Sequence, residues 1–250
     1  MEIDDSRTSI KLADYRAHYD VDADAIDDPS NLDPSRHHSE KRRMEALVRW
    51  LPLAPGVRVL DVGCGAGWFA QQCAAAGATV WATDLSLKGV REARARYPAA
   101  GLFQMGDIYL LPFAGAAFDL VLLSEVLEHL EDLDRALGEV VRVLRPGGMI
   151  LISVPHREKI IQHLCIHCNR FTPANAHLHS FDAASLKKCL HSNGLVPRKQ
   201  TFLNNKLLEL IRFPMRSARL PHGVWRCCDR ILNAVTGKPG FLCVLAEKPE

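Results

Sequence analysis

The amino-acid sequence predicts an α/β protein built on a doubly wound, mostly parallel, Rossmann-like sheet of seven strands. From about residue 57, apolar strand-like runs alternate with helix-like stretches, the pattern of a sheet that helices cover on both faces. The first run, "VRVLDV", leads directly into a glycine-rich turn. The 250 residues suffice for one such domain with elaborations.

Seven stretches are expected to form the sheet. Five apolar runs come first, at residues 57–62, 79–85, 102–108, 118–124 and 148–155. Two later runs, at about 197–203 and 240–247, would complete the sheet.

Helices are expected between these runs, and two have clear boundaries. The stretch "DLDRALGEVVRVL" is amphipathic and ends at "RPGG", where proline cannot continue a helix. In "DAASLKKCLHSNG", Asp182 is a suitable N-cap and Gly194 a suitable stop.

Charge and composition limit the classes of partner. The formal net charge of +2 gives no reason to expect nucleic acid as a partner. The charge is uneven, however, with ten acids and three bases in residues 1–33 and seven bases and two acids in residues 200–238.

Targeting signals and cysteine usage favour the cytoplasm. The first residues lack the pattern of a secretory signal, and no run of about 18 apolar residues occurs. We therefore expect a cytoplasmic protein in which the eight cysteines are reduced thiols or, in part, metal ligands.

The glycine-rich turn after the first strand predicts a ligand site. Gly63, Gly65 and Gly67 would let the backbone approach a ligand at the carboxyl edge of the sheet. The spacing departs from the dinucleotide fingerprint G-x-G-x-x-G, and Trp68 follows at once. With Asp61 before the turn, these departures favour a ligand that carries an amine and no pyrophosphate, although a nicotinamide oxidoreductase stays an alternative.

A second carboxylate extends this site toward a nucleoside. Asp84 ends the second strand candidate, 21 residues after Gly63, where a carboxylate can accept hydrogen bonds from both ribose hydroxyls. The residues by themselves thus indicate nucleoside binding.

Five motifs in series resemble the class I S-adenosylmethionine-dependent methyltransferases over roughly residues 45–160. They are "VLDVGCGAG", "ATDLS", "GDIYLLPF", "FDLVLLSEVLEHL" and "LRPGGMILISVP". The resemblance implies the seven-stranded fold of that class and S-adenosylmethionine as cofactor. The implied cofactor contacts are Asp61, Gly63, Cys64 and Gly65 at the methionine end, Asp84 at the ribose, Leu85, Gly106, Asp107 and Ile108 around adenine, and Ser124 beside the sulfonium and the substrate.

The stretch "SEVLEH" supplies candidate catalytic groups. Glu125, Glu128 and His129 stand at i, i+3 and i+4, so on a helical turn they would share one face and could bind Mg²⁺ or another divalent ion. The element resembles the metal-binding E-x-x-E-H of ubiquinone-biosynthesis O-methyltransferases and small-RNA 2′-O-methyltransferases, in which a later histidine, here His177 or His179, would join. Without metal, His129 is a candidate general base, or these residues only orient the helix and loop.

A zinc site is a competing interpretation of the same histidines. "CIHC" places Cys165 and Cys168 at zinc-ligand spacing, and His177 or His179 could complete a structural site. The alternative is a pair of buried thiols in an insertion that covers the substrate.

The resemblance also divides the chain. It implies an N-terminal lid and substrate segment at 1–44, in which Tyr19 could meet the cofactor, and a methyltransferase domain at 45–250 with insertions at about 156–181 and 204–236. The second insertion mixes apolar and basic residues, as would a helix that touches a membrane surface or an anionic acceptor. Alternatively, its apolar side packs on its own domain.

The predicted activity is methyl transfer from S-adenosylmethionine to a small-molecule acceptor, at an oxygen of a quinone precursor or a natural product. N-methylation of a small amine and a non-catalytic cofactor-binding partner subunit are the alternatives. The sequence does not indicate an oligomeric state.

Overall fold

A computed structural model describes residues 14–22, 32–166 and 169–250. The helices of these residues are α1 (Tyr15–Asp22), α2 (Pro34–Val48), α3 (Trp68–Ala75), α4 (Leu87–Arg96), α5 (Leu133–Val143), α6 (Ala183–Ser192), α7 (Lys206–Leu210), α8 (Phe213–Arg216) and α9 (His222–Thr236), with the 3-10 turns η1 (Leu127–His129) and η2 (Ala174–Ala176). The strands are β1 (Arg58–Val62), β2 (Thr79–Asp84), β3 (Leu102–Met105), β4 (Phe118–Ser124), β5 (Leu144–Pro155), β6 (Gln162–Leu164), β7 (Phe171–Pro173), β8 (Val196–Asn205) and β9 (Pro239–Glu247).

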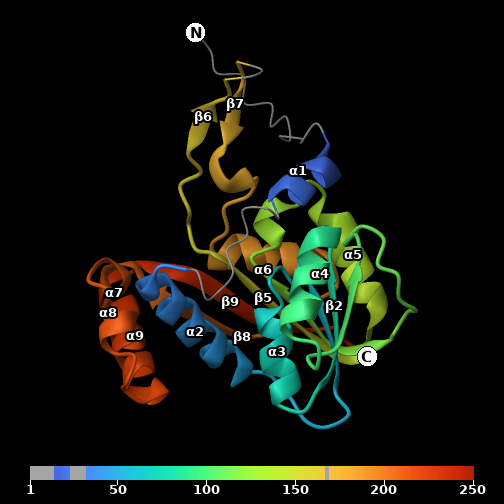
Figure 1. Cartoon of the computed structure of the whole chain (residues 1–250), viewed down its shortest axis with the longest axis horizontal. Coiled ribbons are helices and arrows are strands. Elements are labelled where there is room, and N and C mark those ends of the chain that lie inside the picture. Colours follow the sequence, from blue (N-terminus) through green and yellow to red (C-terminus); the bar gives the residue numbers. More distant parts are fainter. Residues whose placement is uncertain (1–13, 23–31, 167–168) are drawn as a thin grey trace.

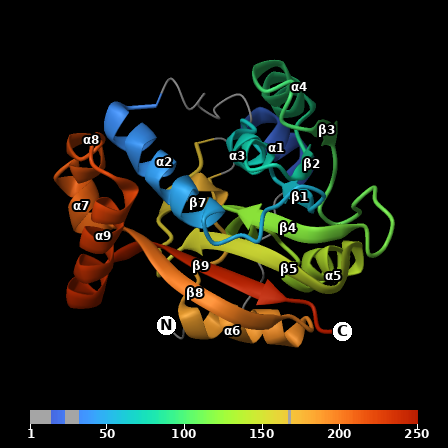
Figure 2. The same cartoon turned by 90° about the horizontal axis from the view of Figure 1, so that it is seen from below.

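The predicted fold class is confirmed. Within the described residues, seven strands form the main sheet in the order β3-β2-β1-β4-β5-β9-β8 (Figures 1 and 2). The first five strands in this order pair in parallel, and β9 runs antiparallel to both β5 and β8. The order reverses between β1 and β4, which is where doubly wound sheets bind ligands.

Apolar strands follow from burial on both faces of the sheet. Leu60 and Val62 point into the core that the sheet forms with α5 and α6. Val59 points the other way, into the core shared with α2, α3, α4 and α9. Because both directions are covered, β1, β4 and β5 read as continuous apolar runs rather than as alternating ones.

The predicted cap at Asp182 and the predicted stops at "RPGG" and Gly194 are confirmed, and α5 has a cap at Asp132 that was not predicted. Asp132 accepts a hydrogen bond from the backbone N–H of Arg135 at 3.0 Å at the start of α5. Asp182 forms a reciprocal capping box with Ser185 at the start of α6, and Gly194 follows that helix with a φ of +74°.

Helices α7–α9 lie at the β8 edge of the sheet beside α2 in both views (Figures 1 and 2). The carboxylate of Asp229, which is fully buried in α9, accepts from the backbone N–H of Asn205 at 2.8 Å and from Arg226 at 2.9 Å. These bonds attach α9 to the end of β8.

The strands β6 and β7 form a separate antiparallel hairpin that stands away from the main sheet in Figure 1. The predicted boundary between residues 44 and 45 falls inside α2, so a single helix joins the two predicted segments. None of the helices in the described ranges has both the length and the apolar character needed to span a bilayer.

Candidate active site

The glycine-rich turn leaves β1 in a backbone conformation that favours glycine. Gly63, Gly65 and Gly67 have φ values of +72°, +47° and +77°. A Cβ on Gly63 would stand 2.6 Å from Val126 Cγ2, whereas one on Gly65 would meet nothing within 4 Å. The turn is therefore packed behind Gly63 and open at Gly65, as close approach of a ligand requires. Cys64, between them, is buried in the core.

Asp61 carries a buried oxygen that has no partner among the described residues. Its side chain is 2 % exposed, and Oδ2 makes no hydrogen bond with the described residues. Burial, together with the charge of Asp84, raises the pKa of Asp61 to about 7. A buried carboxylate oxygen that makes no hydrogen bond with the described residues, beside a bare turn, fits a ligand that brings a positive charge, such as the ammonium of S-adenosylmethionine.

Asp84 organises the turn as well as facing the site. Its Oδ2 accepts from the backbone N–H of Gly65 at 2.9 Å and its Oδ1 from that of Ser86 at 3.0 Å. A carboxylate oxygen can accept more than one hydrogen bond, so these two bonds are compatible with hydrogen bonds from ribose hydroxyls. Leu85, half-buried, follows it directly.

The strand end at Asp107 differs from the prediction. β3 ends at Met105, before the predicted residue 108, because the chain turns at Asp107, whose Oδ1 accepts from the backbone N–H of Tyr109 at 3.0 Å. Gly106 packs closely, since a Cβ there would lie 3.1 Å from the side chain of Thr83. Ile108 is buried in the sheet core.

Helix α1 lies over the ligand edge of the sheet. Tyr15 donates to Asp107 Oδ2 at 2.6 Å, and Tyr19 donates to the backbone carbonyl of His129 at 3.0 Å. Ser86 Oγ also lies 3.3 Å from Asp20 in α1. Sequence reasoning missed Tyr15, although it precedes Tyr19 by one helical turn and so shares its face.

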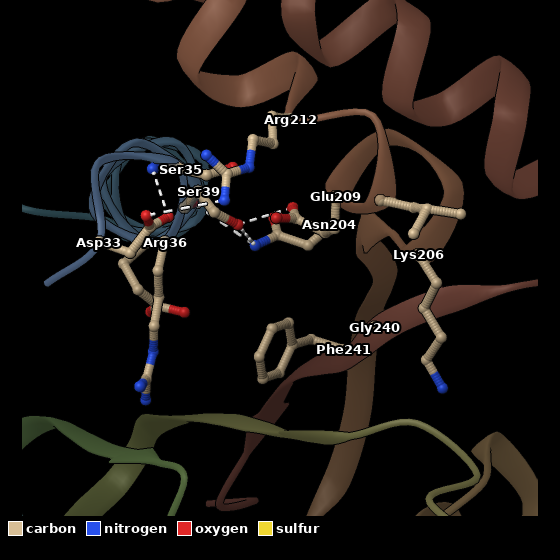
Figure 3. Close-up of a pocket in the computed structure, with 12 residues that line it drawn as sticks. Asp33, Ser35, Arg36, Ser39, Asn204, Lys206, Glu209, Arg212, Gly240 and Phe241 are labelled. Atoms are coloured by element: carbon tan, nitrogen blue, oxygen red, sulfur yellow. Dashed lines mark hydrogen bonds and ion pairs between the residues drawn. The ribbon is translucent and has the colours of Figure 1, made fainter.

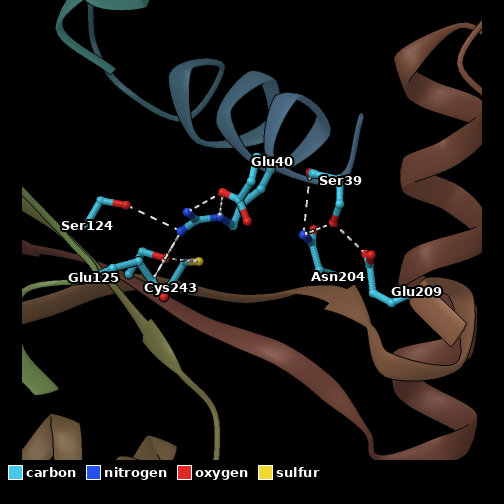
Figure 4. Close-up of polar contacts among 9 residues, drawn as sticks. Ser39, Glu40, Ser124, Glu125, Asn204, Glu209 and Cys243 are labelled. Atoms are coloured by element: carbon cyan, nitrogen blue, oxygen red, sulfur yellow. Dashed lines mark hydrogen bonds and ion pairs between the residues drawn. The ribbon is translucent and has the colours of Figure 1, made fainter. Parts of the chain in front are cut away.

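Glu125 lies in a strained turn at the end of β4. Its φ of +58° is unusual for a residue with a side chain and is a feature that clusters at functional sites. Glu125 Oε1 accepts from Arg43 Nη1 at 3.2 Å and from Ser153 Oγ at 3.3 Å, and the same guanidinium lies 3.3 Å from Ser124 Oγ (Figure 4). Burial raises the pKa of Glu125, and the Arg43 charge opposes that rise.

Arg43 in α2 is the main site residue that sequence reasoning missed. It is 5 % exposed, donates to Glu40 Oε2 at 2.6 Å and lies over the ring of Phe241 at 4.3 Å. A signal was present, because Ser39, Arg43 and Leu47 recur at four-residue spacing on the buried face of α2. An arginine in such a row requires a buried partner.

The predicted metal set is assembled only in part. Ligand atoms of Glu128, His129 and His177 lie within 4.8 Å of one another, the one such group of three among the described residues. Glu125 is not a member, because its left-handed backbone and its bond to Arg43 turn it away from the face it was predicted to share. His177 Nδ1 contacts Glu158.

This group contains further unpartnered atoms. Both carboxylate oxygens of Glu128 and Nδ1 of His129 are buried and make no hydrogen bond with the described residues. Burial, reinforced by Glu125, raises the pKa of Glu128, and burial together with His177 lowers that of His129 to about 4. Such a group suits a divalent cation, which would satisfy the orphaned atoms.

Among the described residues, His179 and Cys165 do not join this group. His179 Nε2 donates to the backbone carbonyl of Leu130 at 2.8 Å instead of reaching the metal set. Cys165 lies beside the β6–β7 hairpin, and Cys168 is outside the described residues. Because Cys168 lies outside the described residues, the zinc set stays a prediction.

A cavity of about 470 Å³ lies between α2, α7 and β9 (Figure 3). Ser39 donates to Glu209 Oε1 at 2.6 Å and accepts from Asn204 at 2.8 Å on its wall, and burial raises the pKa of Glu209 to about 7. Phe241, which lines the cavity, also packs against Arg43. The lining residues are Asp33, Ser35, Arg36, Ser39, Glu40, Asn204, Lys206, Glu209, Leu210, Arg212, Gly240 and Phe241.

Comparison with known proteins gives consistent matches. The family model described as a methyltransferase domain matches residues 60–152. A protein of Mycobacterium tuberculosis named "Probable S-adenosylmethionine-dependent methyltransferase" is 30 % identical over 201 residues, which cover 80 % of this chain and 68 % of that protein. The malonyl-[acyl-carrier protein] O-methyltransferase of Erwinia billingiae is 38 % identical over 144 residues.

Coverage differs among these relatives. The match with the Erwinia billingiae protein covers 54 % of this chain and 57 % of that protein. The chain spans about half the length of other curated relatives. Among solved structures, an S-adenosylmethionine-dependent methyltransferase from Mesorhizobium loti superposes with a TM-score of 0.59 at 23 % identity, over 82 % of this chain and 97 % of that one. This likeness supports the fold.

Proposed function

Because the chain belongs to the S-adenosylmethionine-dependent methyltransferases, we propose that it transfers the cofactor's methyl group to an oxygen of a small or medium-sized acceptor. Suitable methyl acceptors are a hydroxyl or phenol group of a quinone precursor or of a natural product. The strongest support is the buried Oδ2 atom of Asp61, which makes no hydrogen bond with the described residues and lies beside the open turn at Gly65. Relatives named as O-methyltransferases favour oxygen over nitrogen.

The residues at the ends of β1, β2 and β3 would hold the cofactor. Asp61 pairs with the methionine ammonium, the backbone of the turn contacts the methionine chain, and Asp84 accepts from the ribose hydroxyls. Asp107, which accepts a hydrogen bond from Tyr15 of α1, lies on the adenine side of the proposed cofactor site. The bound sulfonium supplies an electrophilic methyl group with a good leaving group, so the protein needs chiefly to orient the acceptor.

The cavity between α2, α7 and β9 is the proposed acceptor site. Its wall offers hydrogen-bonding groups from Ser39, Asn204 and Glu209. Phe241 connects this wall to Arg43 and thereby to Glu125 at the end of β4. Arg43 and Ser153 occupy Oε1 of Glu125, so its Oε2 is the atom that we assign to receive the acceptor proton.

Transfer of labelled methyl groups tests this assignment. Purified protein is incubated with labelled S-adenosylmethionine and a library of phenols, alcohols, carboxylic acids and amines, and the products are identified by mass spectrometry. We expect methyl ethers or esters, and Glu125→Gln should lower kcat at least a hundredfold while cofactor affinity stays within about twofold. The matched control, Glu92→Gln on the exposed face of α4, should leave both unchanged. Labelled N-methyl products alone would contradict the proposal.

We also propose a divalent cation at Glu128, His129 and His177, supported by the orphaned atoms of the first two residues. A cation there would act as a Lewis acid that lowers the pKa of the acceptor hydroxyl. Calorimetric titration of the dialysed protein with Mn²⁺ tests it: His177→Ala should abolish a stoichiometric heat that the control His191→Ala, at an exposed position of α6, retains. Absence of Mn²⁺ binding in the unchanged protein would refute this site.

A further inference from the structure

The outward face of α9 is apolar, which is the reverse of an ordinary surface helix. Val224, Ile231 and Val235 are 45 %, 57 % and 77 % exposed. They recur at spacings of seven and four, which places them on one stripe of the helix. The opposite face buries Trp225 and the charged Asp229 against the domain. The orientation is fixed by the bonds of Asp229 to β8, so the apolar stripe cannot rotate inward without breaking them.

Neighbouring turns add to this surface. Leu207, Leu210 and Ile211, at i, i+3 and i+4 around α7, are 38 %, 78 % and 51 % exposed, and Leu220 before α9 is 44 % exposed. Both views place α7, α8 and α9 together at the β8 edge of the molecule (Figures 1 and 2). We call the exposed apolar side chains the outer helical face: Leu207, Leu210, Ile211, Leu220, Val224, Ile231 and Val235.

The exposed charge of the same segment is positive. Residues 206–238 contain seven bases and two acids, and both acids are engaged. Glu209 binds Ser39, and Asp229 is fully buried. Bases on exposed positions without an ion-pair partner among the described residues are Lys206, Arg216, Arg219, Arg230 and Lys238.

A groove lies between α9 and the end of α2. Its volume is about 690 Å³, and Arg49, His222, Arg230 and Ile231 are among the residues that line it. Arg230 and Ile231 therefore belong at once to the groove and to the edge of the apolar stripe. Arg49 and Arg230 have no ion-pair partner among the described residues, and a concave site with two such guanidinium groups beside exposed apolar side chains matches a phosphate group that is attached to a hydrocarbon chain.

We propose that the outer helical face docks on an anionic lipid surface. The apolar stripe of α9 and the leucines of α7 enter the boundary between head groups and acyl chains, and the surrounding arginines contact lipid phosphates. Leu210 belongs both to this face and to the lining of the proposed acceptor cavity, so docking places that cavity against the lipid. The docking surface is independent of the proposed reaction, because it rests on exposure and charge alone.

Co-sedimentation of the full chain with vesicles tests the proposal. Vesicles of phosphatidylcholine mixed with phosphatidylglycerol are compared with pure phosphatidylcholine at about 150 mM salt. The protein should partition into the anionic vesicles. The combined variant Val224→Ser, Ile231→Ser and Val235→Ser should lower the partition coefficient at least tenfold, and Arg219→Ser or Arg230→Ser about fivefold each.

Matched controls separate docking from general effects. Leu102→Ser, an exposed apolar position on β3, and Arg94→Ser, an exposed base on α4, should leave partitioning unchanged. Circular dichroism should give the same Tm within a few degrees for every variant, since the replaced side chains are exposed.

Two results would overturn the proposal. One is equal partitioning of the unchanged protein and the combined serine variant. The other is that no form of the protein binds vesicles, while analytical ultracentrifugation shows concentration-dependent dimerisation that the serine variant abolishes. That result would assign the face to a second copy of the chain.

Discussion

Asp61 should couple cofactor binding to the release of a proton. Its carboxyl is buried, has an unpartnered oxygen and has a pKa raised to about 7 by burial and by Asp84. In the cofactor-free protein it is therefore protonated below about pH 7. Because pairing with an ammonium requires the carboxylate, binding below this pH must expel the proton.

The magnitude follows from that pKa. Affinity for S-adenosylmethionine should rise about tenfold per pH unit below about pH 6 and level off near pH 7. The affinity should fall again above about pH 8, where the amino group of the free cofactor loses its proton.

The raised pKa of Asp61 also makes the stability of the folded protein depend on pH. The folded-state value of about 7 lies above the ordinary 3.8, so the folded protein holds this proton more tightly than the unfolded chain. The stability that it contributes is fully present below about pH 4 and is lost as pH rises through 7. The loss is about 4 kcal/mol at most.

Calorimetric titration in buffers of different ionisation enthalpy, between about pH 5.5 and 8.5, measures both affinity and proton release. Asp61→Asn should weaken binding at pH 8, remove its dependence on pH below 7, and raise the free energy of unfolding of the cofactor-free protein at pH 8. Asp119→Asn is a control, because Asp119 pairs with Arg58 and Arg145 and has a lowered pKa, chiefly through its hydrogen bond with Arg58. It should lose stability yet keep the pH profile of binding. A profile of the unchanged protein that is flat below pH 7 would refute the reasoning.

Three further substitutions probe the site. Gly63→Ala should lower cofactor affinity at least tenfold in calorimetric titration, because its Cβ would lie 2.6 Å from Val126 Cγ2 at a φ of +72°. The control Gly138→Ala in α5, which has open space around it, should leave the affinity unchanged. Arg43→Met should lower the free energy of unfolding by about 3 kcal/mol in urea titrations at pH 8, since it leaves the half-buried carboxylates of Glu40 and Glu125 without their buried cation; a loss below about 1 kcal/mol would contradict that role. Tyr15→Phe should speed cofactor dissociation several-fold in stopped-flow measurements with little change in Tm, and an unchanged rate would show that α1 does not cover the cofactor.

The sheet could be predicted because its signals are local. Each central strand is a short apolar run, and the cap at Asp182 and the stop at Gly194 lie within a few residues of the helix that they bound. Parallel strands then bring their carboxyl ends to one edge, so Asp61, Asp84 and Asp107 fall together without further information.

The rest of the site depends on contacts between residues far apart in the chain. Arg43 reaches Glu125 and Ser153, which follow it by 82 and 110 residues. The spacing of Glu125, Glu128 and His129 predicted that they share one helical face. They do not, because the backbone at Glu125 is left-handed. Similarly, the outward direction of the α9 apolar stripe is set by the bond from Asn205 to Asp229, which no pattern within the helix reveals.

Binding of S-adenosylmethionine to protein freed of bound ligand tests the central claim most directly. Titration calorimetry should give one cofactor per chain, no measurable heat with NAD⁺, and at least a tenfold loss of affinity in Asp84→Asn, whose amide replaces an acceptor for the ribose hydroxyls. A folded protein that produces no heat with S-adenosylmethionine, or that prefers NAD⁺, would contradict the assignment of the turn at Gly63–Gly67 and of Asp84.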